Sequence, residues 1–148
     1  MLLIWVFMCI FPALIVISSF NSEINNYAIV GSIVWLFGFL FEIIADIQKS
    51  NFNKFNKGEF ISNGLWSITR HPNYFGEFIL WLGITIASLG YIDNYKYVLL
   101  LTPIFVYLLL TRVSGVNLLE EIGEKRWGNS KEYQKYKEKT PLFFPKLF

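Results

Sequence analysis

The chain has 148 residues, of which 54% are hydrophobic and 19% aromatic, and its formal net charge is +2. This length suits one domain, while the hydrophobic content exceeds that of an ordinary water-soluble fold. The single cysteine excludes an internal disulfide, and one cysteine with one histidine argues against a His/Cys metal site.

Four runs of mostly apolar residues predict membrane-spanning helices, because about 20 such residues cross a hydrocarbon core of roughly 30 Å. The runs cover residues 2–20, 27–47, 74–92 and 97–112. The first run has no basic segment before it and no A-x-A cleavage site, which disfavours a cleaved signal peptide. We therefore expect an all-α integral membrane protein with about four transmembrane helices, forming a single membrane domain over residues 1–148.

Basic residues concentrate on one side of these runs. All but Lys96 of the 13 Lys and Arg residues lie either between the second and third runs or after the fourth. The positive-inside rule makes those segments cytoplasmic, which predicts a cytosolic loop over 48–73, a cytosolic tail over 113–148, and cytoplasmic N- and C-termini. Because topology explains the basic residues, nucleic acid is not an expected partner.

The two polar segments differ in their predicted structure. The loop is rich in Asn, Ser, Gly and Lys and predicts little regular structure, and Pro72 suits the first turn of the helix that follows. In the tail, the amphipathic "NLLEEIGEKRW" predicts one helix. Ser130 is placed to cap a second helix, which Pro141 ends.

Two acids lie near the end of the second run. Glu42 and Asp46 are four residues apart and so share a helix face, roughly the face of Gly31 and Gly38, which would let a neighbouring helix approach closely. Acids at membrane depth tend to line a cavity, so a place in a substrate pocket is one interpretation. The other is that both side chains reach water at the interface.

A polar cluster, "SITRHPNYFGE" (residues 67–77), precedes the third run. Arg70, His71, Asn73 and Tyr74 together form a set able to bind a polar, anionic or planar ligand. Glu77 belongs to this set, although an acid in a first helical turn is also typical of a residue favoured by the helix dipole.

The tail carries a second cluster. Arg112 ends the fourth run, and its guanidinium offers a planar fork suited to phosphate or carboxylate. Flat surfaces for stacking a nucleobase or a nicotinamide ring come from Trp66, Tyr74, Tyr133 and Tyr136. The sequence contains no G-x-G-x-x-G after a strand, no P-loop and no G-x-S-x-G elbow.

Both clusters carry a family resemblance. "GLWSITRHPNYFGEFILWLGITIAS" (residues 64–88), followed by "RVSGVNLLEEIGEKRWGNSKEYQKYKEKTPLFFPKLF", resembles the C-terminal catalytic half of the steroid 5-alpha-reductase superfamily, in its bacterial branch of uncharacterised predicted reductases. The portion from Asn73 to Glu77, with Trp81, is similar to the steroid reductases themselves. A looser version of the pattern is similar to the isoprenylcysteine carboxyl methyltransferases and phospholipid methyltransferases.

The resemblance implies that the cytosolic loop and the C-terminal helices close over a cofactor pocket. The cofactor would be NADPH, as in the reductases, or S-adenosylmethionine, as in the methyltransferases. The implied catalytic residue is Glu77, which would orient or protonate a polarised carbonyl or alkene, and Trp81 joins Glu42 and Asp46 as a substrate-pocket candidate. The implied cofactor-binding residues are Trp66, Arg70, His71, Asn73, Tyr74, Arg112, Arg126, Tyr133 and Tyr136.

Three hypotheses follow from these observations. The first is an NADPH-dependent reductase of a hydrophobic, steroid-like or isoprenoid enone, with the lipid bilayer and a hydrophobic small molecule as partners. The second is methyl transfer from S-adenosylmethionine to a lipid or prenyl carboxylate. The third is a truncated membrane protein without turnover, because members of the family usually carry further N-terminal helices.

Overall fold

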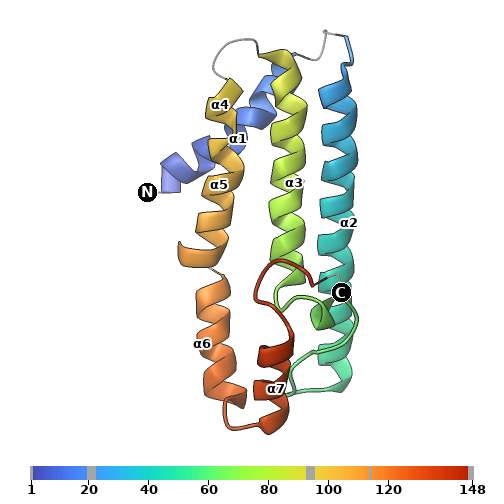
Figure 1. The fold of residues 1–148 in the computed structure, drawn as a ribbon, viewed down its shortest axis with the longest axis vertical. Helices are drawn as coiled ribbons and strands as arrows, with labels where there is room; N and C mark the ends of the chain where they lie inside the picture. The colour runs from blue at the N-terminus through green and yellow to red at the C-terminus, as the bar shows by residue number, and fades with distance from the viewer. Residues whose placement is uncertain (1, 20–22, 93–95, 114, 147–148) are drawn as a thin grey trace. The chain divides into compact units, whose positions relative to one another are not determined.

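The computed structural model describes residues 2–19, 23–92, 96–113 and 115–146 (Figure 1). Helices account for its regular structure, and the described residues contain no strand, which confirms the all-α fold class. The elements are α1 (Leu2–Ser18), α2 (Asn26–Phe55), a 3-10 turn (Gly64–Ser67), α3 (Pro72–Ser88), a second 3-10 turn (Leu89–Tyr91), α4 (Lys96–Leu99), α5 (Leu101–Leu108), a π-helical turn (Leu109–Val113), α6 (Val116–Trp127) and α7 (Lys131–Lys139).

The chain folds into two compact units. The first unit comprises residues 1–39 and 77–109, and the second comprises residues 40–76 and 110–148. Helices α2 and α3 each contribute residues to both units. The organisation of residues 1–148 as a single domain stays a prediction.

Within the described residues, three helical segments are long and apolar enough to cross a membrane, namely Asn26–Phe55, Pro72–Tyr91 and Leu101–Trp127. Helix α1 has 17 residues, which is short of the roughly 20 that span a hydrocarbon core. The membrane class is therefore supported, while four spans and cytoplasmic termini stay predictions.

Within the first unit, α2 and α3 approach closely at two glycines. A Cβ on Gly31 would lie 2.6 Å from the carbonyl oxygen of Gly83, and a Cβ on Gly83 would lie 2.7 Å from that of Gly31. Neither backbone could yield to such a contact, so the crossing requires glycine at both positions. The close approach predicted for the glycine face of the second run is thus present at Gly31.

In the second unit, α2 continues to Phe55, so the predicted loop begins later than residue 48. Lys54 lies in the last turn, where a cation is favoured by the helix dipole. The Asn56 side chain donates to the carbonyl of Phe52 at 3.1 Å, and Gly58, with φ of 90°, follows in a conformation that ordinary residues avoid. These features place the end of the helix about two turns beyond the apolar run.

The C-terminal segment of the second unit lies along residues 67–70. The amide of Arg70 donates to the carbonyl of Pro141 at 2.9 Å, and the amide of Lys146 donates to that of Ile68 at 2.9 Å. The buried Thr69 hydroxyl adds a bond of 2.9 Å to the carbonyl of Phe143. The segment before α3 and the end of the chain are therefore held together by backbone hydrogen bonds.

The tail helices form where the sequence predicts them. The Ser130 hydroxyl accepts from the amide of Tyr133 at 3.3 Å, which confirms Ser130 as the N-cap of α7, and α7 ends at Lys139, before Pro141. Over the predicted fourth span, residues 97–112, the structure has α4, α5 and the π-helical turn in place of one uniform α-helix. Gly115 then separates this region from α6, with φ of 75°.

Candidate functional site

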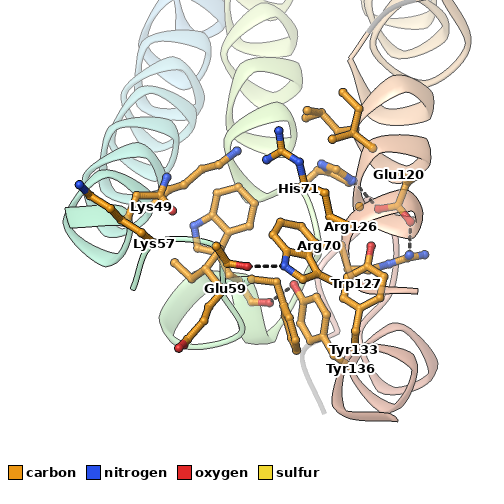
Figure 2. A pocket seen from close by; sticks show the side chains of 18 residues that line it. Lys49, Lys57, Glu59, Arg70, His71, Glu120, Arg126, Trp127, Tyr133 and Tyr136 are labelled. Atoms are coloured by element: carbon orange, nitrogen blue, oxygen red, sulfur yellow. Dashed lines mark hydrogen bonds and ion pairs between the residues drawn. The ribbon is translucent and has the colours of Figure 1, made fainter. Parts of the chain in front are cut away.

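The second unit contains a pocket of about 420 Å³ (Figure 2). Its walls come from the end of α2, the segment 57–71, α6 and α7. The charged and imidazole side chains that line it are Lys49, Lys57, Glu59, Arg70, His71, Glu120 and Arg126. The aromatic side chains that line it are Phe60, Trp66, Trp127, Tyr133 and Tyr136.

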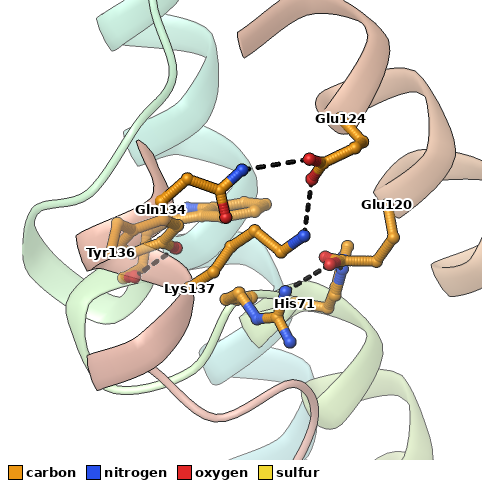
Figure 3. A network of polar contacts seen from close by, with 8 residues as sticks. His71, Glu120, Glu124, Gln134, Tyr136 and Lys137 are labelled. Carbon is orange, nitrogen blue, oxygen red and sulfur yellow. Dashed lines mark hydrogen bonds and ion pairs between the residues drawn. The ribbon is translucent and has the colours of Figure 1, made fainter. Parts of the chain in front are cut away.

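Glu120 joins two residues of the predicted polar cluster. One carboxylate oxygen, Oε1, lies 2.8 Å from Nε2 of His71, and the other, Oε2, forms an ion pair with the Arg70 guanidinium (Figures 2 and 3). The Arg70 and His71 side chains are only 14% and 6% exposed, and that of Glu120 is 23% exposed. A carboxylate in this position fixes the orientation of both neighbours, because each oxygen holds one of them.

Three buried polar atoms in this region have no hydrogen-bond partner among the described residues. They are Nε of Arg70, Nδ1 of His71 and Oδ1 of Asn73. Leaving a buried polar atom unpaired costs about 1–3 kcal/mol. A bound polar ligand or an ordered water would supply the missing partners.

The polar ends of three aromatic side chains are tied to backbone carbonyls. The Trp66 indole donates to the carbonyl of Ala45 at 3.0 Å, and the Tyr136 hydroxyl donates to that of Trp66 at 2.7 Å. The Trp127 indole donates to the carbonyl of Gly58 at 2.6 Å (Figure 2). These bonds fix the planes of the rings that line the pocket.

Phe60 lies at the centre of the aromatic wall. Its ring centroid is 5.1 Å from that of Tyr133, 5.5 Å from that of Tyr136 and 6.0 Å from that of Trp127. Gly123 on α6 leaves room for this wall, because a Cβ there would meet the Tyr133 hydroxyl. The pocket therefore presents fixed aromatic surfaces of the kind on which planar rings stack.

Both tyrosines of the wall favour their neutral form. Burial raises the pKa of the Tyr133 phenol, and the carboxylates of Glu120 and Glu124 raise it further. Burial also raises the pKa of Tyr136 well above its ordinary value, with Arg70 acting in the opposite sense. At neutral pH both hydroxyls are therefore hydrogen-bond donors.

A second set of polar contacts links α6 to α7 (Figure 3). The Lys137 ammonium lies 2.6 Å from Oε2 of Glu124, and the Gln134 amide donates to Oε1 of Glu124 at 3.0 Å. The Gln134 amide also donates to the carbonyl of Gly128 at 2.8 Å. These bonds bridge the turn between the two helices and hold α7 beside the pocket wall of α6.

Six of the nine predicted cofactor-binding residues line this pocket, and the structure thereby brings together Trp66, Arg70, His71, Arg126, Tyr133 and Tyr136. The remaining three do not line it. The ring of Tyr74 is 5.9 Å from that of His71, Asn73 follows Pro72 in α3, and Arg112 is exposed in the π-helical turn.

The predicted substrate-pocket and catalytic residues do not line this pocket. Glu42 is half-buried and Asp46 exposed, both on the α2 portion of the second unit, and neither lines the pocket. Glu77 and Trp81 belong to the first unit, where the Trp81 side chain donates a hydrogen bond to the Glu77 carboxylate. Their roles in the reaction stay predictions.

Sequence reasoning missed several lining residues. Membrane topology accounts for the positions of Lys49 and Lys57, so the sequence does not single them out as ligand-binding residues. In the structure, the Lys49 ammonium lies 4.9 Å from the centroid of the Trp66 ring. Glu120 belongs to the polar cluster of the tail but is not among the predicted site residues. No feature of the local sequence distinguishes Glu120 from the neighbouring Glu121.

Comparison with known proteins places the chain in a family. A probable O-methyltransferase, ustE of Ustilaginoidea virens, is 38% identical over 71 residues, which cover 46% of this chain and 25% of the relative. The chain thus matches about a quarter of that protein's length, and no solved structure matches it significantly. The family described as "Protein of unknown function (DUF1295)" matches residues 1–140. Because this match covers nearly the whole sequence, the chain belongs to the DUF1295 family.

Proposed function

We propose that the chain is a membrane-embedded, NADPH-dependent reductase of a hydrophobic steroid-like or isoprenoid enone. The observation that carries the proposal is the pocket of the second unit, which combines an excess of cations with fixed aromatic surfaces. The three candidate spans support a substrate drawn from the lipid phase.

The charge of the pocket favours a polyanionic ligand. Four basic side chains (Lys49, Lys57, Arg70 and Arg126) and two acids (Glu59 and Glu120) line it, so these six side chains have a formal net charge of +2. NADPH carries a pyrophosphate and a phosphomonoester, and such groups are bound through Arg and Lys. S-adenosylmethionine carries a sulfonium and an ammonium against one carboxylate, so the same cations would oppose its binding.

The residues present also fit a dinucleotide by their hydrogen-bonding capacity. Nε of Arg70 and Nδ1 of His71 are buried without partners among the described residues, and a phosphate, ribose or carboxamide could satisfy them. The rings of Trp66 and Tyr136 could stack with a planar base. When bound, NADPH would supply the two electrons of the reduction as hydride.

The residues of this chain would bind the cofactor and orient the reacting groups. Glu120 would hold Arg70 and His71 in place through its two oxygens. Glu77 would polarise or protonate the substrate, as the resemblance to the steroid reductases implies.

Methyl transfer is the second candidate. Its support is the similarity to a probable O-methyltransferase, together with the looser resemblance of the "RHPNY" segment to lipid methyltransferases. In that case S-adenosylmethionine would take the place of the dinucleotide, and the substrate would be a lipid or prenyl carboxylate.

Ligand titration separates the candidates. The protein, purified in mild detergent, is titrated with NADPH and with S-adenosylmethionine while the intrinsic tryptophan fluorescence, to which Trp66 and Trp127 contribute, is followed. Saturable binding of NADPH is expected, and Arg70→Ala should weaken it by about 1.5–3 kcal/mol through the loss of charge-assisted bonds. The exposed Lys131 on α7 gives a matched control, because Lys131→Gln removes a cation outside the pocket. Saturable binding of S-adenosylmethionine alone would overturn the reductase proposal and support methyl transfer.

A further inference from the structure

The C-terminal segment over residues 141–146 presents apolar side chains on a backbone that is held in place. Three hydrogen bonds tie this backbone to residues 68–70. The Phe143 side chain is only 4% exposed, whereas Leu142 and Phe144 on either side of it are 37% and 54% exposed. The segment therefore buries one ring in the second unit and leaves the two flanking apolar side chains at the surface.

The exposed ring of Phe144 lies beside the start of a candidate membrane span. Its centroid is 6.3 Å from that of Phe75, which is the fourth residue of the span Pro72–Tyr91. The hydrogen bonds of the segment reach residues 68–70, directly before this span (Figure 1). The segment is thus fixed where α3 would enter the hydrocarbon layer.

A second candidate span indicates the same depth. The Phe75 ring centroid is 5.3 Å from that of Phe41 on α2, and Phe41 lies six residues before Ile47, at which the apolar run of α2 ends. Six helical residues rise about 9 Å, so Phe41 lies well inside the apolar part of the span. The two spans together place the surroundings of Phe144 at the edge of the hydrocarbon layer, where an exposed phenylalanine gains by entering lipid.

We propose that residues 141–146 form an interfacial membrane anchor, in which Leu142 and Phe144 enter the lipid acyl region. The backbone suits this place, because Pro141 and Pro145 have no amide N–H to satisfy and the carbonyls of Pro141 and Phe143 already accept hydrogen bonds. The exposed Lys146 has a long side chain that can reach the lipid phosphates. The inference does not depend on the proposed reductase function, because it concerns the surface of the segment and not the ligand of the pocket.

Spin-label accessibility tests the anchor in bilayers. The single cysteine of the chain, Cys9, is replaced by serine, and one nitroxide is then attached to Leu142→Cys, Phe144→Cys or Lys131→Cys. Each protein is reconstituted into phosphatidylcholine vesicles after its far-UV circular dichroism has been matched to that of the wild-type chain. Collision of the label with oxygen, which concentrates in lipid, is compared with collision with a water-soluble nickel complex. Lys131 is the matched control, because it is exposed at the first position of α7.

The labels on the segment should differ from the control in the direction of their accessibility. At positions 142 and 144, the ratio of oxygen to nickel accessibility should be several-fold higher than at position 131. Nickel accessibility at either position equal to that at position 131 would overturn the proposal, because the segment would then lie in water. Low accessibility to both reagents would also overturn it, because protein, such as a second copy of this chain, would then cover the segment in place of lipid.

Discussion

The contact between Gly123 and Tyr133 allows us to predict how the Gly123→Ala substitution changes the stability of the protein. A Cβ on Gly123 would meet the Tyr133 hydroxyl oxygen and lie 3.3 Å from Cζ. The tyrosine ring cannot swing away freely, because the ring centroids of Phe60 and Trp127 lie 5.1 and 5.7 Å from its own. Overpacking of this kind costs about 1–3 kcal/mol. Replacement of glycine by alanine within a helix contributes about 1 kcal/mol in the stabilising direction, so Gly123→Ala should destabilise by about 0–2 kcal/mol.

Gly123→Ala should have a different effect on stability when the Tyr133 hydroxyl is removed. In a Tyr133→Phe background the clash is largely absent, and Gly123→Ala should stabilise the protein by up to about 1 kcal/mol through helix propensity. The four proteins of this double-mutant cycle are compared by thermal unfolding in one detergent, followed by far-UV circular dichroism. An equal effect of Gly123→Ala in both backgrounds would refute the reasoning, because it would show that the hydroxyl does not limit the space at Gly123.

Two further predictions concern the polar groups of the pocket. Glu120→Ala leaves Arg70 and His71 without their shared carboxylate, and the thermal unfolding should show a loss of about 1.5–3 kcal/mol, below the value for a fully buried pair because Glu120 is 23% exposed. Glu121→Ala is the matched control, since it breaks only the exposed pair with Lys125 and should change the stability little. Equal losses in the two variants would contradict the role of Glu120. The second prediction follows from the raised pKa of Tyr136. The unfolded chain releases the phenolic proton first, near pH 10, so the contribution of this group is fully present below that pH and declines as the pH rises above it. Thermal unfolding between about pH 9 and 11 should show a shallower loss for Tyr136→Phe than for the wild-type chain, and parallel curves would disprove this assignment.

Much of the helical architecture could be predicted because it depends on local patterns. Apolar run length identified the segments around α2 and α3, and the N-cap at Ser130 followed from side-chain chemistry. The predicted end of α2 is too early, because the sequence from Gln48 onward is polar and predicts a loop. A polar segment can remain helical when its last turn is satisfied by a cation and a side-chain hydrogen bond, as Lys54 and Asn56 provide here.

Only part of the candidate site could be predicted, because some of its residues contact partners that are far away in the sequence. Arg70 and Tyr136 were identifiable from residue type and position in the two clusters. The partner of Arg70 is Glu120, fifty residues away in sequence, and nothing local distinguishes this acid from the neighbouring Glu121. The positive-inside rule already accounts for a basic residue at Lys57, so the sequence offers no separate reason to place this residue in the pocket wall.

Because of the hydrogen bonds made by the C-terminal segment, the pocket wall that carries Arg70 can be completed only after that segment has been synthesised. The segment that carries Arg70 leaves the ribosome long before Pro141 and Phe143, whose carbonyls bind Arg70 and Thr69. While translation continues, one wall of the pocket lacks its support, and the nascent protein cannot yet hold a ligand there. A premature stop codon just before residue 141 would therefore leave a product that retains its apolar helices and lacks these hydrogen bonds to the segment that carries Arg70.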